Sequence, residues 1–183
     1  VFDFRHINNS PAVFDMTKLS WMNGEYLHAM DPDEFYLHAE PVLKSCLKGN
    51  FDLHKIAEMV QSRIQLYSDI PEQVDFLDAV PDYDISMYTH KKSKSTAESS
   101  LEIIRDLIPI LEKTDAFDND SLFAVLSSYA SEKEYKVNKV MWPLRLAVSG
   151  KQATPAGATG IMELLGKDES LRRLQAAAEK LQS

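Results

Sequence analysis

The chain has 183 residues, of which 44% are hydrophobic, and it contains a single cysteine, Cys46. This length allows one domain or two small ones with a buried core, and a lone cysteine excludes an intrachain disulfide and a Cys-x-x-Cys zinc site. No apolar run approaches the roughly 20 residues that span a bilayer. We therefore expect a cytoplasmic monomer, and because the chain starts at Val1 we expect a fragment of a longer protein.

The formal net charge of −8 is unevenly distributed along the chain. Residues 1–90 hold six Lys and Arg against 15 Asp and Glu, whereas residues 91–183 hold 14 against 13. Phosphate binding depends on cationic side chains that displace counterions, so we expect any nucleic acid to bind the second half. The most basic stretch runs from Lys133 to Lys151, which contains five cationic residues and the single acid Glu134.

Apolar residues recur mostly at intervals of three and four, and only 6 glycines occur, which indicates a nearly all-helical chain. Asp31, Asp52 and Thr96 each precede such a pattern and are expected to cap helices. Asp168 is expected to cap a last helix that reaches about Leu181.

Three prolines, Pro41, Pro109 and Pro143, fall inside helical patterns. The missing amide and the ring clash of proline are expected to kink or split each helix. We therefore predict many short helices rather than a long bundle.

The polar stretch from His90 to Ser100 is the expected boundary between two small helical subdomains. The predicted fold is all-α, with the first subdomain at residues 31–95 and the second at residues 96–183. Residues 1–30 are expected to lead into the first subdomain.

Three segments of the chain resemble one known family. Ser10–Tyr26 reads SPAVFDMTKLSWMNGEY, Met59–Arg63 reads MVQSR, and Lys139–Gly150 reads KVMWPLRLAVSG and is followed by Thr154-Pro155 and by ELLG at 163–166. In this order and spacing they resemble the bacterial-type, class I glutamyl-tRNA synthetases. The first segment resembles the end of the stem-contact region, and the other two resemble the two anticodon-binding subdomains. The resemblance spans essentially the whole chain and implies a helical cage for a tRNA anticodon.

The resemblance implies a parent enzyme that joins glutamate to its tRNA with ATP and Mg²⁺. This chain has no His-Ile-Gly-His-type sequence, so we expect the fragment to be inactive. Lys91–Ser95 (KKSKS) imitates the family's Lys-Met-Ser-Lys-Ser loop but lies downstream of where that loop belongs, and we interpret it as a solvated linker. The expected partner is the tRNA for glutamate, with the tRNA for glutamine as a second candidate, and neither DNA nor a membrane. The alternative is a stand-alone helical scaffold whose acidic first half binds a protein.

Arg145 is the leading candidate for reading a base. Its guanidinium offers planar, pre-organised donors, and its position one turn after Met141 and beside Leu144 restricts its rotamers. The resemblance implies that it contacts an anticodon base. The alternative is a surface arginine paired with an acid such as Glu163.

Thr154-Pro155 is typical of an N-cap followed by the first residue of a helix, where free backbone amides can donate hydrogen bonds to an anion or a carbonyl. The resemblance implies that this turn, with Gly157, holds the middle anticodon base, and the alternative is an ordinary cap. The sequence departs from the family at Ala156, where glycine is common, and at Gly160, where a polar residue is common.

Arg63 is predicted to lie on the helix that contains Ile56 and Met59. From the residues alone we expect Arg63 to form a structural salt bridge, whereas the resemblance implies that it reads the third anticodon base. Lys136, Lys139 and Lys151 are expected to bind backbone phosphates.

We assign no catalytic residue and no metal site, since the histidines lack ligand spacing and no Ser/His/Asp order emerges. Met141 and Trp142 could serve as platforms on which bases stack, but their helical spacing favours core residues, and Trp21 is likewise interpreted as a core residue.

Overall fold

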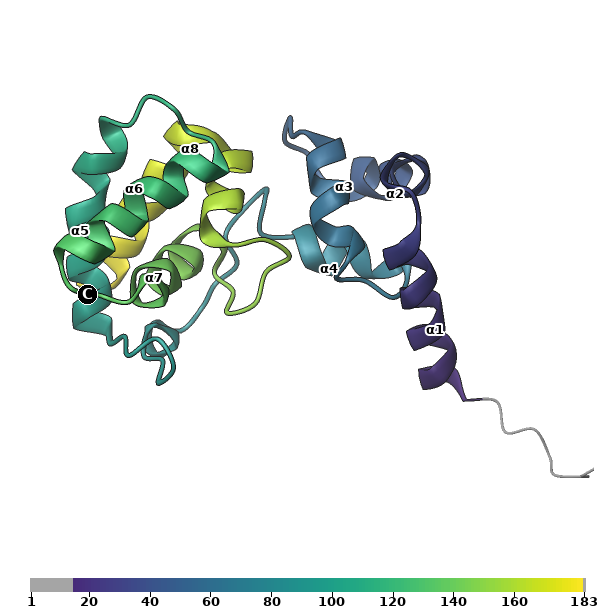
Figure 1. Cartoon of the computed structure of the whole chain (residues 1–183), viewed down its shortest axis with the longest axis horizontal. Coiled ribbons are helices and arrows are strands. Elements are labelled where there is room, and N and C mark those ends of the chain that lie inside the picture. Colours follow the sequence, from purple (N-terminus) through teal and green to yellow (C-terminus); the bar gives the residue numbers. More distant parts are fainter. Residues whose placement is uncertain (1–14, 183) are drawn as a thin grey trace, which may run out of the picture.

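The computed structural model describes residues 15–182, which fold into helices joined by loops (Figure 1). In this range the only extended pairing is an isolated bridge between His90 and Ser95, so the predicted all-α fold is confirmed. None of the helices found here combines the length and hydrophobicity that crossing a bilayer requires. The elements in chain order are α1 (Met16–Ala29), α2 (Pro32–Cys46), α3 (Leu53–Gln61), η2 (Tyr67–Asp69), α4 (Ile70–Val74), η3 (Ile85–Tyr88), α5 (Ala97–Glu112), α6 (Asn119–Glu132), α7 (Val137–Ser149) and α8 (Ala158–Lys180).

Helices α1–α4 form a first helix group, in which α2 packs against α3 and α4. Its core contains Phe35, Ile56 and Ile70, which are all fully buried. The predicted caps Asp31 and Asp52 are confirmed, because each carboxylate accepts hydrogen bonds from backbone amides of the helix that follows.

Helix α1 projects from the rest of the first helix group (Figure 1). Only Gly24 and Leu27 are buried along it, and Trp21 is 56% exposed. The interpretation of Trp21 as a core residue is therefore wrong within residues 15–182, where more than half of its side chain is exposed. The end of α1 is held by Gln61, whose side-chain amide donates to the Leu27 carbonyl at 2.9 Å.

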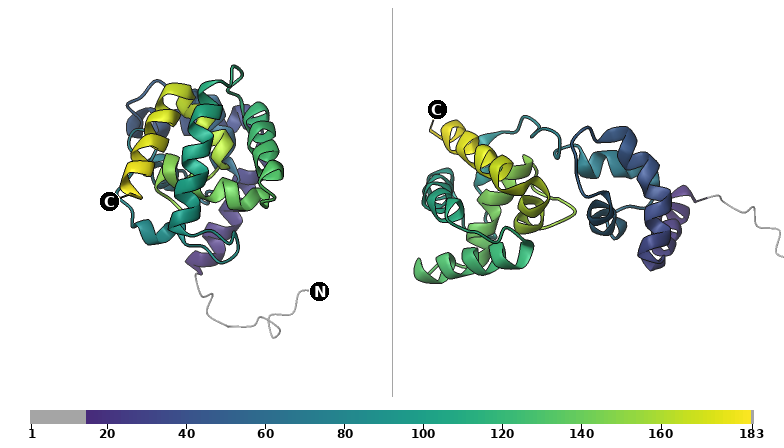
Figure 2. Two further views of the ribbon diagram at one scale, coloured as in Figure 1. Left: turned by 90° about the vertical axis from the view of Figure 1, so that its left-hand side faces the viewer. Right: turned by 90° about the horizontal axis from the view of Figure 1, so that it is seen from above.

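Helices α5–α8 form a second helix group, and Figure 2 (left) shows α5 between α8 and α6. Helix α8 packs against both α5 and α7, and the core between them contains Leu107, Leu144, Ile161 and Leu174. Thr96 caps α5 as predicted and forms a capping box with its first turn. The segment between α4 and α5, which we name the connecting segment, contains η3. Because η3 contacts α5 and α7, this segment already packs on the second helix group before the expected boundary at His90. The division into two subdomains stays a prediction.

The expected splitting of helices at proline is not seen. Pro41, Pro109 and Pro143 lie inside α2, α5 and α7, each of which continues through its proline. Buried side chains on both sides of the proline, such as Ala39 and Leu43 in α2, offset the loss of one backbone hydrogen bond.

Helix α8 contains the last predicted helix but begins earlier. At Gly166 the backbone leaves helical geometry, with φ 75° and ψ 171°, and the helix resumes before Asp168. The predicted helix from Asp168 to about Leu181 is thus the second part of α8, and Ala158–Leu165 is its first part.

Arg173 of α8 joins the two helix groups. Its side chain is 2% exposed, and the guanidinium donates to the carbonyls of Phe76, Leu77 and Val148 at 2.7–2.8 Å. The first two carbonyls follow α4, and the third belongs to α7. This buried cation therefore fixes the end of the first helix group against the second.

Candidate nucleic-acid interface

The loop between α7 and α8, Gly150–Gly157, extends toward the first helix group (Figure 2, right), and we name it the α7–α8 loop. Together with Arg63, Glu72 and Gln73 of the first helix group, this loop lines an open hollow of about 540 Å³. Gly150 begins the loop with φ +67°, a left-handed conformation that favours glycine. A Cβ atom there would lie 3.0 Å from the Pro81 carbonyl oxygen, so glycine is also required by the close approach of the connecting segment.

Arg145 lies on α7 beside this loop and is half-buried. Its Nη1 donates to the Gln152 carbonyl at 3.3 Å, while its buried Nε has no hydrogen-bond partner. Burial, and then the nearby charge of Arg63, lower the pKa of the Arg145 guanidinium. The alternative pairing with Glu163 is not seen, because that carboxylate pairs with Lys55 at 2.5 Å. Arg145 is thus a fixed donor with unused hydrogen-bonding capacity.

Arg63 does not lie on the predicted helix. Helix α3 ends at Gln61, and Arg63 occupies the following turn, where its amide donates to the Val60 carbonyl at 2.8 Å. The chain leaves the helix here and buries Ile64 in the core, which leaves the Arg63 side chain exposed. Within residues 15–182 it makes no ion pair with a carboxylate, so the alternative of a structural salt bridge is not seen.

The prediction that Thr154 caps a helix is wrong. Helix α8 begins at Ala158 with Gly157 as its N-cap, and the Thr154 hydroxyl instead donates to the Ala156 carbonyl at 2.6 Å inside the loop. Pro155 is buried and precedes the helix rather than opening it. Because Gly157 has no side chain, no side-chain cap covers the first turn of α8, and Gly157 itself is exposed. The predicted open helix terminus therefore exists, but it lies three residues later.

Ala156 and Gly160, the two departures from the family pattern, lie against each other. A Cβ atom on Gly160 would approach the Ala156 Cβ to 3.2 Å, closer than ordinary van der Waals contact. The glycine at 160 thus makes room for the alanine at 156, and the loop keeps its path.

The three predicted phosphate-binding lysines have different surroundings. Lys136 is exposed at the start of α7, and Lys139 stands over the Tyr135 ring at 3.8 Å. Lys151 instead binds Asp75 at 2.6 Å and the Glu72 carbonyl at 2.7 Å, which ties the α7–α8 loop to the first helix group. This placement favours a structural role for Lys151, and the phosphate roles stay predictions.

The structure thus brings Arg63, Thr154 and Pro155 to one hollow, places Arg145 against the loop that lines it, and leaves Lys136 and Lys139 farther along α7. Met141 and Trp142 are half-buried against the core rather than free as platforms. Sequence reasoning missed Arg173, because only burial distinguishes it from its neighbour Arg172. Among the described residues no cluster of three or more His, Cys, Asp or Glu is arranged to hold a metal ion.

Comparison with known proteins gives one consistent result. The glutamate–tRNA ligase of Lachnoclostridium phytofermentans is 48% identical over all of this chain, which covers 37% of that protein. That of Clostridium acetobutylicum is 46% identical, with 38% of its length covered. A crystal structure of the glutamate tRNA ligase from Elizabethkingia meningosepticum, in complex with its amino acid, superposes with a TM-score of 0.79 at 26% identity, covering 98% of this chain and 35% of that one.

The chain therefore spans little more than a third of these relatives, and it matches their C-terminal portion. Residues 34–178 match the family model described as the anticodon binding domain. The resemblance noted in the sequence is confirmed, and the chain belongs to the anticodon binding domain family of glutamate–tRNA ligases.

Proposed function

We propose that this chain binds the anticodon loop of a tRNA and that Arg63, Arg145 and the α7–α8 loop contact its bases. One observation carries the proposal: two arginines from different helix groups come near each other at the α7–α8 loop. Neither is neutralised by a carboxylate within residues 15–182.

Two neighbouring cations without a counter-charge repel each other, and burial of Arg145 adds to the cost of its charge. A ligand with hydrogen-bond acceptors between them removes both penalties. The edges of unstacked RNA bases offer such acceptors, and the planar fork of a guanidinium suits them. The net charge of −8 does not argue against this ligand, because reading bases needs a few fixed donors rather than a large basic surface.

The relatives suggest which RNA and which protein are involved. Because they are named glutamate–tRNA ligases, we propose the tRNA for glutamate as the partner, with the tRNA for glutamine as the competing species. The parent protein would attach glutamate with ATP and Mg²⁺ in parts beyond this chain. In this chain, selection of the tRNA is the expected task.

The test is a titration of the 183-residue chain with tRNA transcripts that differ in one anticodon base. A correctly read base contributes on the order of 1–3 kcal/mol, so the cognate transcript should bind roughly 5- to 150-fold more tightly than the variants. Arg145→Ala should remove most of this preference while the affinity for the variant transcripts changes little. Arg145→Lys should keep the charge but lose the preference, because an ammonium lacks the planar fork.

Arg105→Ala is the matched control, because Arg105 is also a helix arginine but lies exposed on α5, outside the hollow. It should leave the preference intact. Equal weakening of every transcript by Arg145→Ala would make Arg145 a phosphate contact. Absence of RNA binding together with capture of a basic protein would favour the helical-scaffold alternative.

A further inference from the structure

The segment His90–Ser95 is an ordered loop rather than the solvated linker that its sequence suggests, and we name it the basic loop. His90 and Ser95 exchange two backbone hydrogen bonds, of 3.0 and 3.2 Å, which close the loop. Inside it the buried hydroxyls of Ser93 and Ser95 lie 2.8 Å apart. Lys94 adopts φ +54°, a left-handed conformation that completes the turn.

Helix α7 holds the basic loop in place. The His90 ring stacks on the Trp142 indole, with ring centroids 3.8 Å apart and planes 10° from parallel. The indole N–H donates to the Met87 carbonyl at 3.1 Å, which fixes the indole in turn. The loop is therefore pre-organised, so a ligand that binds it does not have to order it first.

The basic loop presents Lys91, Lys92 and Lys94, which are all exposed. Within residues 15–182 none of them forms an ion pair, whereas Lys133 is paired with Asp106. Their positive charges are therefore available to a ligand.

A hollow of about 240 Å³ connects the basic loop to Arg145. His90, Lys92 and Ser93 line one side of it, and the α7 residues Asn138, Met141, Trp142 and Arg145 line the other. Arg145 thus has the α7–α8 loop on one side and this second hollow on the other. A nucleotide bound in the second hollow would lie next to the base that Arg145 contacts.

We infer that the basic loop binds an RNA backbone phosphate of the nucleotide adjoining the base at Arg145, through Lys92, which alone of the three lysines lines the second hollow. This inference rests on the proposed function. Lysine binds phosphate as a point charge, so the contact sets the register of the strand without reading sequence. The basic loop would thereby position the base next to Arg145.

The test uses the 183-residue chain and a triple variant, Lys91→Gln, Lys92→Gln and Lys94→Gln, titrated with the anticodon-variant transcripts at several salt concentrations. The triple variant should weaken binding to every transcript by the same factor and keep the base preference. The slope of log K against log salt should become shallower by about 0.7 for each phosphate that the variant no longer binds, as for single-stranded nucleic acid. Lys92→Gln alone should give the largest single effect.

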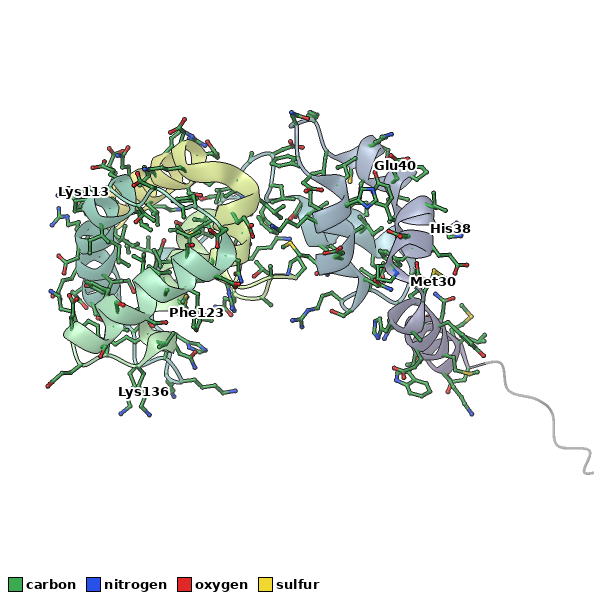
Figure 3. The ribbon with its side chains drawn as sticks, turned by 45° about the horizontal axis from the view of Figure 1, so that its top comes forward. Met30, His38, Glu40, Lys113, Phe123 and Lys136 are labelled. Carbon is green, nitrogen blue, oxygen red and sulfur yellow. The ribbon has the colours of Figure 1, made fainter. Side chains whose placement is uncertain are left out.

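Lys113→Gln is the matched control: an exposed lysine that Figure 3 places at the upper edge of the second helix group, away from Lys136 at the lower edge. It should leave the salt slope unchanged. If the triple variant keeps the wild-type affinity and slope while the wild type still distinguishes transcripts, the inference is wrong and the proposed function stands. A changed base preference in the triple variant would also overturn it, because the loop would then contact a base. If the wild type shows no anticodon preference, the proposed function itself fails.

Discussion

Replacement of Arg173 by methionine should destabilise the chain more than any other single arginine change. Methionine approximates the length and volume of the arginine stem but cannot donate hydrogen bonds. The substitution removes three hydrogen bonds to carbonyls, and two of these acceptors follow α4 while the third lies in α7. It does not strand the Glu169 carboxylate, which keeps its two hydrogen bonds from Arg172 at 2.6 and 2.7 Å.

The size of the effect follows from burial. A hydrogen bond to a charged group contributes about 1.5–3 kcal/mol, but three such contributions do not simply add, because water partly rehydrates the freed carbonyls. Each buried carbonyl that is left without a donor costs about 1–3 kcal/mol, and after partial rehydration we expect a total loss of about 3–5 kcal/mol. For a chain of this size each kcal/mol lowers the melting temperature by roughly 2–4 °C, so the midpoint should fall by roughly 6–20 °C.

Thermal and urea unfolding, followed by circular dichroism, measure the loss. Arg172→Met is the matched control: the adjacent arginine contacts the same carboxylate, but its side chain is 66% exposed. An exposed ion pair contributes about 0–1 kcal/mol, so this variant should unfold close to the wild type. Similar midpoints for the two variants would refute the reasoning that burial of Arg173 joins the helix groups.

Three further predictions concern the two ends of the α7–α8 loop and acid stability. Gly150→Ala should destabilise the chain by about 1–2 kcal/mol or more in urea unfolding, because its φ is +67° and a Cβ would crowd Pro81. Gly157→Ala should leave the unfolding midpoint unchanged, since nothing lies within 4 Å of its Cβ position, and any loss of RNA binding would then report a close approach by the ligand. The hydrogen bond from Arg172, together with Arg173, lowers the pKa of Glu169 from 4.5 to about 2. Because the folded value is the lower one, this carboxylate stabilises the fold above about pH 4.5, and its contribution should be lost as the pH falls toward 2. When urea unfolding is repeated at a series of pH values, the free energy of unfolding of Glu169→Gln should fall less steeply below pH 4.5 than that of the wild type. Equal slopes for the two proteins would contradict a stabilising role for the Glu169 carboxylate.

The local features of the fold were predictable from the sequence. Asp31, Asp52 and Thr96 cap helices as expected, because a cap and the amides that it accepts lie within a few residues of each other. The apolar spacing of three and four residues likewise predicted the all-α fold, and the quoted segments predicted the family. Each of these properties is determined by residues that lie close together in the sequence, so a short stretch of sequence is enough to predict it.

The candidate site was predictable only as a set of residues. The sequence indicated Arg63, Arg145 and Thr154-Pro155, but it placed Arg63 on a helix and began a helix at Thr154. The structure ends α3 before Arg63 and uses the Thr154 hydroxyl inside the loop, because burial of Ile64 and the path of the α7–α8 loop decide these points.

What the sequence by itself determined is the helical character of the chain, most of its caps and its family. Only the tertiary structure decided that Arg63 and Arg145 lie near each other, that Arg173 is buried, and that the basic loop packs on Trp142. The physical reason is sequence separation: Arg173 donates to a carbonyl 97 residues away in the chain, and such contacts depend on how whole helices pack. A pattern read over a few residues contains no record of that packing.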